Sequence, residues 1–209
     1  IRIVNNGIDT GEINSYNEDT GISPLRRKNK EHDLVLLSVA NHVKHKNIFR
    51  ILEVVKKLKS AGKNPLLINA GAGNLTEEIM RRIKTDNLGE NVYLAGNIGN
   101  SAVINLMKSA DAFVTLADRS IFDLSLLEAA ACGLPVVAEL TGGNSEILKD
   151  YPGCIVVTGE DADGICKKLI ETFYGKSRVP EITDYTFRFT IQNMITEYEK
   201  IFLELTDAR

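Results

Sequence analysis

The sequence predicts an α/β fold built on a doubly wound parallel sheet, and three observations carry this prediction. Short apolar runs alternate with segments of helical periodicity from residue 33 to residue 174. The run at 33–40 is almost continuously apolar, as expected of a strand buried on both faces. The helical segments fall between consecutive runs, where a parallel sheet needs its crossover connections. Strands and helices that alternate at this spacing are typical of doubly wound parallel sheets.

Strands are expected wherever an apolar run is bounded by turn residues. A short strand in residues 1–9 should stop at an Asn-Asn-Gly turn. The strands of the main sheet are expected at 33–40, 65–70, 91–96, 112–117, 135–139 and 154–158.

Helices are expected between these strands. Residues 47–62 are amphipathic, with lysines crowding the last turn and Gly62 as an end signal. Asn74 is expected to cap the next helix, with Glu77 at the capping-box position. Further helices are expected at 101–110, 124–133, 144–150 and 161–174.

The last helical segment, 185–205, differs from the others because its apolar stripe is unbroken. The stripe comprises Ile191, Met194, Ile195, Tyr198, Ile201, Phe202 and Leu205. Two alternatives remain open for it: packing on this domain, or reaching another domain.

Composition excludes several classes of function. The chain has 209 residues and a net charge of −3, so no overall positive field points to nucleic acid. No apolar run approaches the length of a membrane span, and no secretory signal is visible. The three cysteines lack metal-ligand spacing, which indicates free thiols in a reducing cytosol.

Residues 10–31 are polar and irregular and carry a basic cluster, Arg26, Arg27, Lys28 and Lys30. A solvated linker is the favoured interpretation of this segment. Contact with nucleic acid or anionic lipid is the alternative.

Ligands of open parallel sheets bind beyond the carboxyl ends of the strands, so the loops that follow each strand are the candidate site. In the first loop, 41–47, Lys46 lies just ahead of a helix and can face an anion together with the helix amides. His42 and His45 are expected to be solvent-facing rather than metal ligands, because neither carboxylate nor Cys flanks them. The second loop, 70–74, holds Gly73 in a weak Gly-x-Gly pattern. The loop at 140–144 supplies two more glycines for close backbone approach.

Glu128 is the only charged residue between Leu124 and Leu134, on a short apolar helix. Burying an unpaired carboxylate is costly. One alternative is a functional role, in which the carboxylate accepts hydrogen bonds from a vicinal diol such as a ribose. The other is a structural Glu that pairs with neighbouring backbone or a Lys.

The motifs resemble a family of transferases. "SIFDLSLLEAAACGLPVVAELTGGNSEIL" closely resembles the donor-site segment of the retaining "group 1" glycosyltransferases of GT-B fold, and "VNNGID" resembles their interdomain linker. "SVANHVKHKN", "INAGAGN" and "VYLAGNI" match the following strand ends in order, and "TIQNMITEYEKIF" resembles the terminal crossover helix. The resemblance covers essentially the whole chain and implies a Rossmann-like donor-binding domain.

The resemblance also implies roles for individual residues. Glu128 would bind the nucleotide ribose, and Lys46 would hold the diphosphate and act catalytically by stabilising the leaving group. The backbone of Asn97 and Ile98 would lie near the base. The amides of Phe122, Asp123, Leu124 and Ser125 would face the phosphates and the sugar, with Gly73 nearby.

Four positions depart from the family pattern. Ser120 stands where the family has a Glu that contacts the donor sugar, and Asn41 replaces an Arg of the first loop. Ile121 and Asp123 replace the two glycines that flank Phe122. Asp118 or Asp123 can take over the sugar contact, or Asp123 can simply cap the helix.

The sequence therefore predicts three regions: an interdomain linker at 1–31, a nucleotide-sugar domain at 32–180 and a crossover helix at 181–209. Because the chain begins at Ile1, it is expected to be the donor half, without the N-terminal acceptor half. The expected function is transfer of a sugar, with retention, from a nucleotide diphosphate sugar to a polysaccharide, lipid or other glycoconjugate.

The expected protein is cytoplasmic and needs neither metal nor cofactor, and any peripheral membrane association would come through the missing half. A non-catalytic, glycosyltransferase-like binding or scaffold subunit is the alternative, favoured by Ser120 and Asn41. A nicotinamide-dependent oxidoreductase is disfavoured because the first loop contains no glycine.

Overall fold

A computed structural model describes residues 2–16, 32–175 and 188–207. Its core is a six-stranded sheet in the order β3-β2-β1-β4-β5-β6, and all of its strand pairs are parallel. The strands are β1 (Leu34–Val39), β2 (Pro65–Ala70), β3 (Val92–Gly96), β4 (Ala112–Thr115), β5 (Val136–Ala138) and β6 (Cys154–Val156). This is the doubly wound order, so the predicted fold class and the six predicted strands are confirmed.

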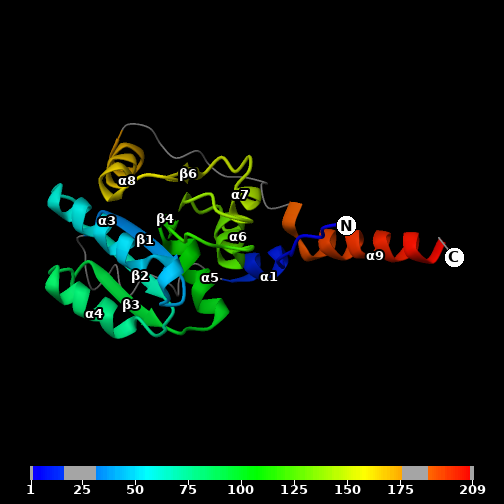
Figure 1. Cartoon of the computed structure of the whole chain (residues 1–209), viewed down its shortest axis with the longest axis horizontal. Helices are drawn as coiled ribbons and strands as arrows, with labels where there is room; N and C mark the ends of the chain where they lie inside the picture. The colour runs from blue at the N-terminus through cyan, green and yellow to red at the C-terminus, as the bar shows by residue number, and fades with distance from the viewer. Residues whose placement is uncertain (1, 17–31, 176–187, 208–209) are drawn as a thin grey trace.

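Helices cover both faces of the sheet (Figure 1). One face packs against α3 (Ile48–Ser60), α4 (Thr76–Thr85) and α8 (Ala162–Leu169), which continues as a π-helical turn at Ile170–Tyr174. The other packs against α1 (Thr10–Ser15), α5 (Asn100–Ser109), α6 (Leu124–Ala131) and α7 (Asn144–Ile147). Side chains of β1 alternate between these two layers, as the strand period of two requires: Val35 and Leu37 face one, Leu34 and Leu36 the other.

The amino-terminal segment departs from the sequence prediction. Residues 2–9 form no strand, and Ile8 makes only an isolated bridge with Thr190. Instead, Asp9 caps the short helix α1, accepting a hydrogen bond from the Glu12 amide at 2.9 Å. An isolated apolar run forms a stable strand only when it pairs with other strands, whereas a helix cap needs only a side chain close in sequence to accept from the first helix amides.

The start of α4 was also predicted wrongly. The helix begins at Thr76 with Leu75 at the N-cap position, and no side chain caps it. The Thr76 hydroxyl instead donates to the Gly73 carbonyl at 2.8 Å and accepts from its amide at 3.0 Å. A turn closed by Thr76 thus replaces the predicted Asn74–Glu77 capping box.

The two chain segments at 7–8 and 189–191 lie side by side. The Ile8 amide donates to the Phe189 carbonyl at 2.8 Å, and the Ile191 amide donates to Ile8 at 3.0 Å. Beyond this crossing, α9 (Ile191–Asp207) extends away from the sheet (Figure 1). Phe202 and Leu205 of its apolar stripe are 62% and 63% exposed, so this part of the stripe does not pack on the domain.

The basic cluster Arg26, Arg27, Lys28 and Lys30 lies outside the described residues. Within the described residues, no helix is both long and apolar enough to cross a membrane.

Candidate functional site

The candidate site lies where the strand order reverses, between β1 and β4. In doubly wound sheets this switch point opens a crevice at the carboxyl ends of the strands. The loop after β1 carries Lys46, in a short 3₁₀ turn at Lys44–Lys46. The loop after β4 carries Asp123, which immediately precedes α6. Two residues 77 positions apart in sequence therefore meet at the switch point.

Two cavities open at this edge and share one wall. The larger, of about 960 Å³, is lined by His45, Lys46, Thr141, Gly142 and residues 118–125. The smaller, of about 310 Å³, is lined by Val39, Ala40, Asn41, Lys46, Ala70, Gly71, Asn97, Ile98, Val103, Asp123 and Ser125. The residues common to both linings are Lys46, Asp123 and Ser125. We call these three residues the shared wall.

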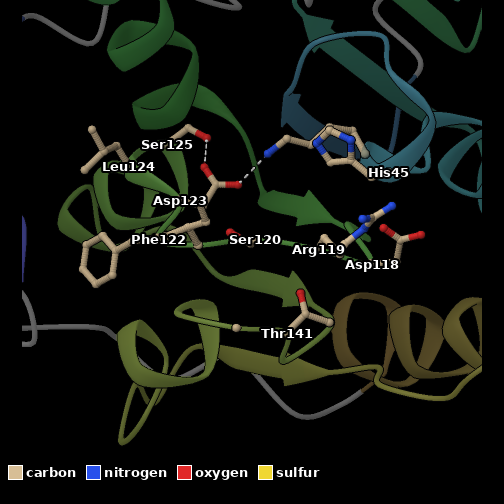
Figure 2. A pocket seen from close by; sticks show the side chains of 12 residues that line it. His45, Asp118, Arg119, Ser120, Phe122, Asp123, Leu124, Ser125 and Thr141 are labelled. Carbon is tan, nitrogen blue, oxygen red and sulfur yellow. Dashed lines mark hydrogen bonds and ion pairs between the residues drawn. The ribbon is translucent and has the colours of Figure 1, made fainter.

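The shared wall is held by two polar contacts (Figure 2). Lys46 Nζ lies 3.1 Å from Asp123 Oδ2, and Ser125 Oγ donates to Asp123 Oδ1 at 2.7 Å. The side chains of Lys46 and Asp123 are only 21% and 8% exposed, so solvent screens this pair weakly. Asp123 occupies the N-cap position of α6, but no helix amide donates to its side chain. The expected cap is therefore one of position and charge, without a capping hydrogen bond.

The structure brings most of the predicted site residues to the two cavities. Asn41, Asn97 and Ile98 line the smaller cavity. Ser120, Phe122 and Leu124 line the larger one. Gly73 and Glu128 are absent from both linings.

Sequence reasoning missed Arg119 and Thr141, which line the larger cavity (Figure 2). His45, which was expected only to face solvent, lines it as well. All three lie on loops that follow strands, so position relative to the predicted strands was a signal that could have identified them.

Contrary to the prediction, His42 does not face solvent. It is 1% exposed, with Nδ1 2.8 Å from Thr76 Oγ1 and Nε2 2.5 Å from Asn69 Oδ1. These contacts tie the first loop to the second, since Asn69 belongs to β2 and Thr76 begins α4. Gly73 serves the same junction, because a Cβ there would lie 2.7 Å from the His42 carbonyl oxygen. The glycine of the second loop that lines a cavity is Gly71.

Glu128 is half-buried on α6, and no hydrogen bond or ion pair to its carboxylate is found among the described residues. Burial raises the pKa of this carboxyl, and the negative charges of Asp123 and Glu12 raise it further. The structural alternative, a Glu paired with backbone or a Lys, therefore has no partner in the described part of the chain.

Ser120 is engaged within the protein. Its hydroxyl donates to Asn144 Oδ1 at 2.9 Å, and Asn144 is fully buried at the start of α7. At the position where the resemblance implies a sugar-binding Glu, this chain thus carries a hydroxyl that links the loops after β4 and β5.

The three cysteines are free thiols, as predicted. Burial raises the pKa of Cys132 to about 12 and that of Cys154 to about 11. Both thiols therefore stay protonated at neutral pH and are poor nucleophiles.

The loop at 141–143 packs against the Ser120 loop so tightly that only glycine fits at position 142. At Gly142 (φ +53°) an added Cβ would lie 1.8 Å from the Ser120 carbonyl oxygen. We expect Gly142→Ala to lower the free energy of unfolding by about 3 kcal/mol, from left-handed strain plus overpacking, as measured by urea denaturation. Gly62→Ala is the matched control, because Gly62 also has positive φ (+76°) but no atom within 4 Å of the added Cβ. It should cost only about 1 kcal/mol, and equal losses in the two variants would contradict the packing argument.

Comparisons with known proteins agree with this architecture. The sequence model of the "Glycosyl transferases group 1" family matches residues 22–180. A GDP-mannose-dependent monoacylated alpha-(1-6)-phosphatidylinositol monomannoside mannosyltransferase of Corynebacterium glutamicum is 31% identical over 128 residues, which is 58% of this chain and 33% of the relative. N-acetyl-alpha-D-glucosaminyl L-malate synthase of Bacillus anthracis is 23% identical over 182 residues, which is 84% of this chain and 46% of the relative.

Solved structures share the fold at low sequence identity. Anabaena Alr3699/HepE in complex with UDP superposes with a TM-score of 0.82 at 16% identity, over 97% of this chain and 57% of that one. Sucrose-phosphate synthase of Thermosynechococcus elongatus gives a TM-score of 0.78 at 17% identity, over 100% of this chain and 53% of that one. The chain spans 33% and 46% of the two curated relatives.

The family match covers most of the chain. The chain belongs to the group 1 family of glycosyl transferases.

Proposed function

We propose that this chain is the donor-binding half of an enzyme that moves a sugar, with retention, from a nucleoside diphosphate to an acceptor. The observation that carries the proposal is the pair of cavities joined by the shared wall. A nucleotide sugar has the same three-part order: a nucleoside, a charged diphosphate and a sugar. The nucleoside would occupy the smaller cavity beside Asn97 and Ile98, the diphosphate would meet Lys46, and the sugar would extend into the larger cavity.

Charge and helix geometry support the phosphate position. α6 begins beside the two cavities, with Asp123 at its N-cap, and the positive end of a helix favours an anion there. Lys46 adds an ammonium from the opposite loop. Together they would stabilise the negative charge that develops on the departing diphosphate, which is the catalytic contribution this half can make.

Glu128 would complete the nucleotide site. Its carboxylate lies one turn inside α6, and side chains of a helix tilt toward the helix N-terminus. A ribose carries two adjacent hydroxyls, and both can donate to one carboxylate. Such a ligand would give the unpaired charge the hydrogen bonds that the described protein residues do not supply.

The regions beside the domain fit a two-domain enzyme. Residues 1–31 would be the linker from an acceptor half, and residues 181–209 would carry the helix that returns to it. The exposed apolar residues of α9, such as Phe202 and Leu205, would then be covered by that half. The acceptor would be a polysaccharide, a lipid or another glycoconjugate, and the setting would be the cytoplasm or the inner face of a membrane.

Calorimetric titration of this chain with UDP, GDP and ADP tests the proposal. Saturable binding of at least one of the three is expected, with one site per chain. Failure of all three to bind at millimolar concentration would overturn the proposal.

A non-catalytic binding subunit is the second candidate, and the Ser120–Asn144 hydrogen bond favours it. A hydroxyl used inside the protein does not replace a carboxylate that contacts sugar. The two candidates separate by hydrolysis of a bound nucleotide sugar: an active donor site releases sugar slowly into water, whereas a binding subunit returns the donor intact.

The chain alone is expected to transfer no sugar, because its site would lack the acceptor wall and the closure that excludes water. The measurement is incubation of the purified 209-residue chain with radiolabelled nucleotide sugar and glycolipid or oligosaccharide acceptors. Labelled acceptor above background would contradict the expectation, whereas free labelled sugar would not.

A further inference from the structure

Asp123 places a negative charge beside the cation that the proposed donor needs. Its carboxylate lies 3.1 Å from Lys46 Nζ and is held there by the Ser125 hydroxyl at 2.7 Å (Figure 2). The family resemblance has a glycine at this position, with no side chain at all. Where the resemblance implies a glycine, this chain carries an acidic group at the shared wall.

The charge of Asp123 offsets part of the attraction that Lys46 has for a diphosphate. Lys46 is the only cation among the three residues of the shared wall, and Asp123 pairs with it, whereas Arg119 lines only the larger cavity. Asn41 contributes no charge where the resemblance implies an arginine. The carboxylates of Asp123 and Glu128 also repel each other, since the charge of Asp123 raises the pKa of Glu128.

We infer that Asp123 competes with the donor's diphosphate for Lys46 and so keeps nucleoside diphosphate affinity low. This inference rests on the proposed function. When a diphosphate arrives, it must share Lys46 with the carboxylate or displace it, and the pair re-forms when the diphosphate leaves. Because both side chains are largely buried, the competing attraction and the repulsion between carboxylate and phosphate are weakly screened. A nucleotide product held less tightly is released faster, and product release limits turnover in many enzymes.

The test is calorimetric titration of the wild-type chain and Asp123→Asn with UDP, GDP and ADP. We expect Asp123→Asn to bind at least tenfold more tightly, which corresponds to about 1.4 kcal/mol. The factor should be the same for every nucleotide that binds, because the change acts on the phosphates and not on the base. Asp123→Gly, which also removes the carboxylate, should shift affinity in the same direction, so the result does not depend on the folding of one variant.

Asp86→Asn is the matched control. Asp86 has the same side-chain exposure as Asp123, 8%, and pairs with Lys56 at 2.8 Å. It follows α4, however, and so lies at the amino ends of the strands, away from the two cavities. Its replacement should leave nucleotide affinity within twofold of wild type.

The outcomes separate this inference from the proposed function. Equal affinity of wild type and Asp123→Asn would overturn the inference and leave the donor site standing. A loss of affinity in Asp123→Asn would show that the carboxylate holds the ligand, which also overturns it. Absence of binding to every variant would overturn the proposed function and the inference with it.

Discussion

Replacing Lys46 with Met should lower the affinity of this chain for nucleoside diphosphates at least 30-fold. Two effects act in the same direction. The phosphates lose the ammonium at the shared wall, and the Asp123 carboxylate, now without its partner at 3.1 Å, repels them. Truncating one member of a largely buried charge pair commonly costs about 2–5 kcal/mol in binding. Titration calorimetry with whichever of UDP, GDP and ADP binds best is the measurement.

Lys44→Met is the matched control for this change. Lys44 lies on the same 3₁₀ turn and lines neither of the two cavities at the switch point. Its replacement by Met removes the same charge. Its replacement should change affinity by less than threefold. If the two variants lose affinity equally, the general charge of the loop would account for the effect, and Lys46 would have no specific place in the site.

The sheet was predictable because its strands are buried on both faces. Runs such as Leu34–Val39 and Pro65–Ala70 have no polar face to confuse with a helix, and every residue of both runs except Val39 is buried. The strand predicted in residues 1–9 did not form in its described part, 2–9, because burial between neighbouring strands is what stabilises such a run. Residues 2–9 contain apolar side chains but find no neighbouring strand, so the chain uses a local helix cap at Asp9 instead.

The candidate site was predictable at the level of loops and less so at the level of contacts. The rule that ligands bind beyond the carboxyl ends of parallel strands places Lys46 and Asp123 on the same edge. It does not say that their side chains pair, since that depends on loop conformations that the sequence pattern does not fix. His42 illustrates the same limit: a polar residue in a loop is usually exposed, but here Asn69 and Thr76 offer it buried partners.

Glu128 is where folding and binding are expected to conflict. Replacing Glu128 with Gln should raise the free energy of unfolding of the ligand-free chain at pH 7 by about 0.5–2 kcal/mol. This is the usual gain when a substitution removes a residue that is kept for function at the expense of stability. Burial and the charges of Asp123 and Glu12 raise the pKa of Glu128, so the folded chain binds a proton at Glu128 more readily than the unfolded chain does. The unfolding free energy contributed by Glu128 is therefore lost as pH rises from the ordinary carboxyl range through the raised value. Urea denaturation of wild type and Glu128→Gln across pH 4–8 measures the difference, which should vanish toward the acid end.

The same substitution should weaken nucleotide binding, by about 1–3 kcal/mol, because a neutral amide accepts hydrogen bonds from ribose hydroxyls less strongly than a carboxylate does. A variant that folds more stably and binds less tightly cannot owe its lost affinity to unfolding, which makes Glu128→Gln an informative single change for this site. Glu146→Gln is a suitable control, because Glu146 is exposed and its carboxylate accepts, among the described residues, only one hydrogen bond, from the Asn5 side-chain amide at 2.7 Å. That control should leave both stability and affinity nearly unchanged. If Glu128→Gln instead lowers stability at pH 7, the carboxylate has a structural partner, and the case for a ribose contact at Glu128 fails.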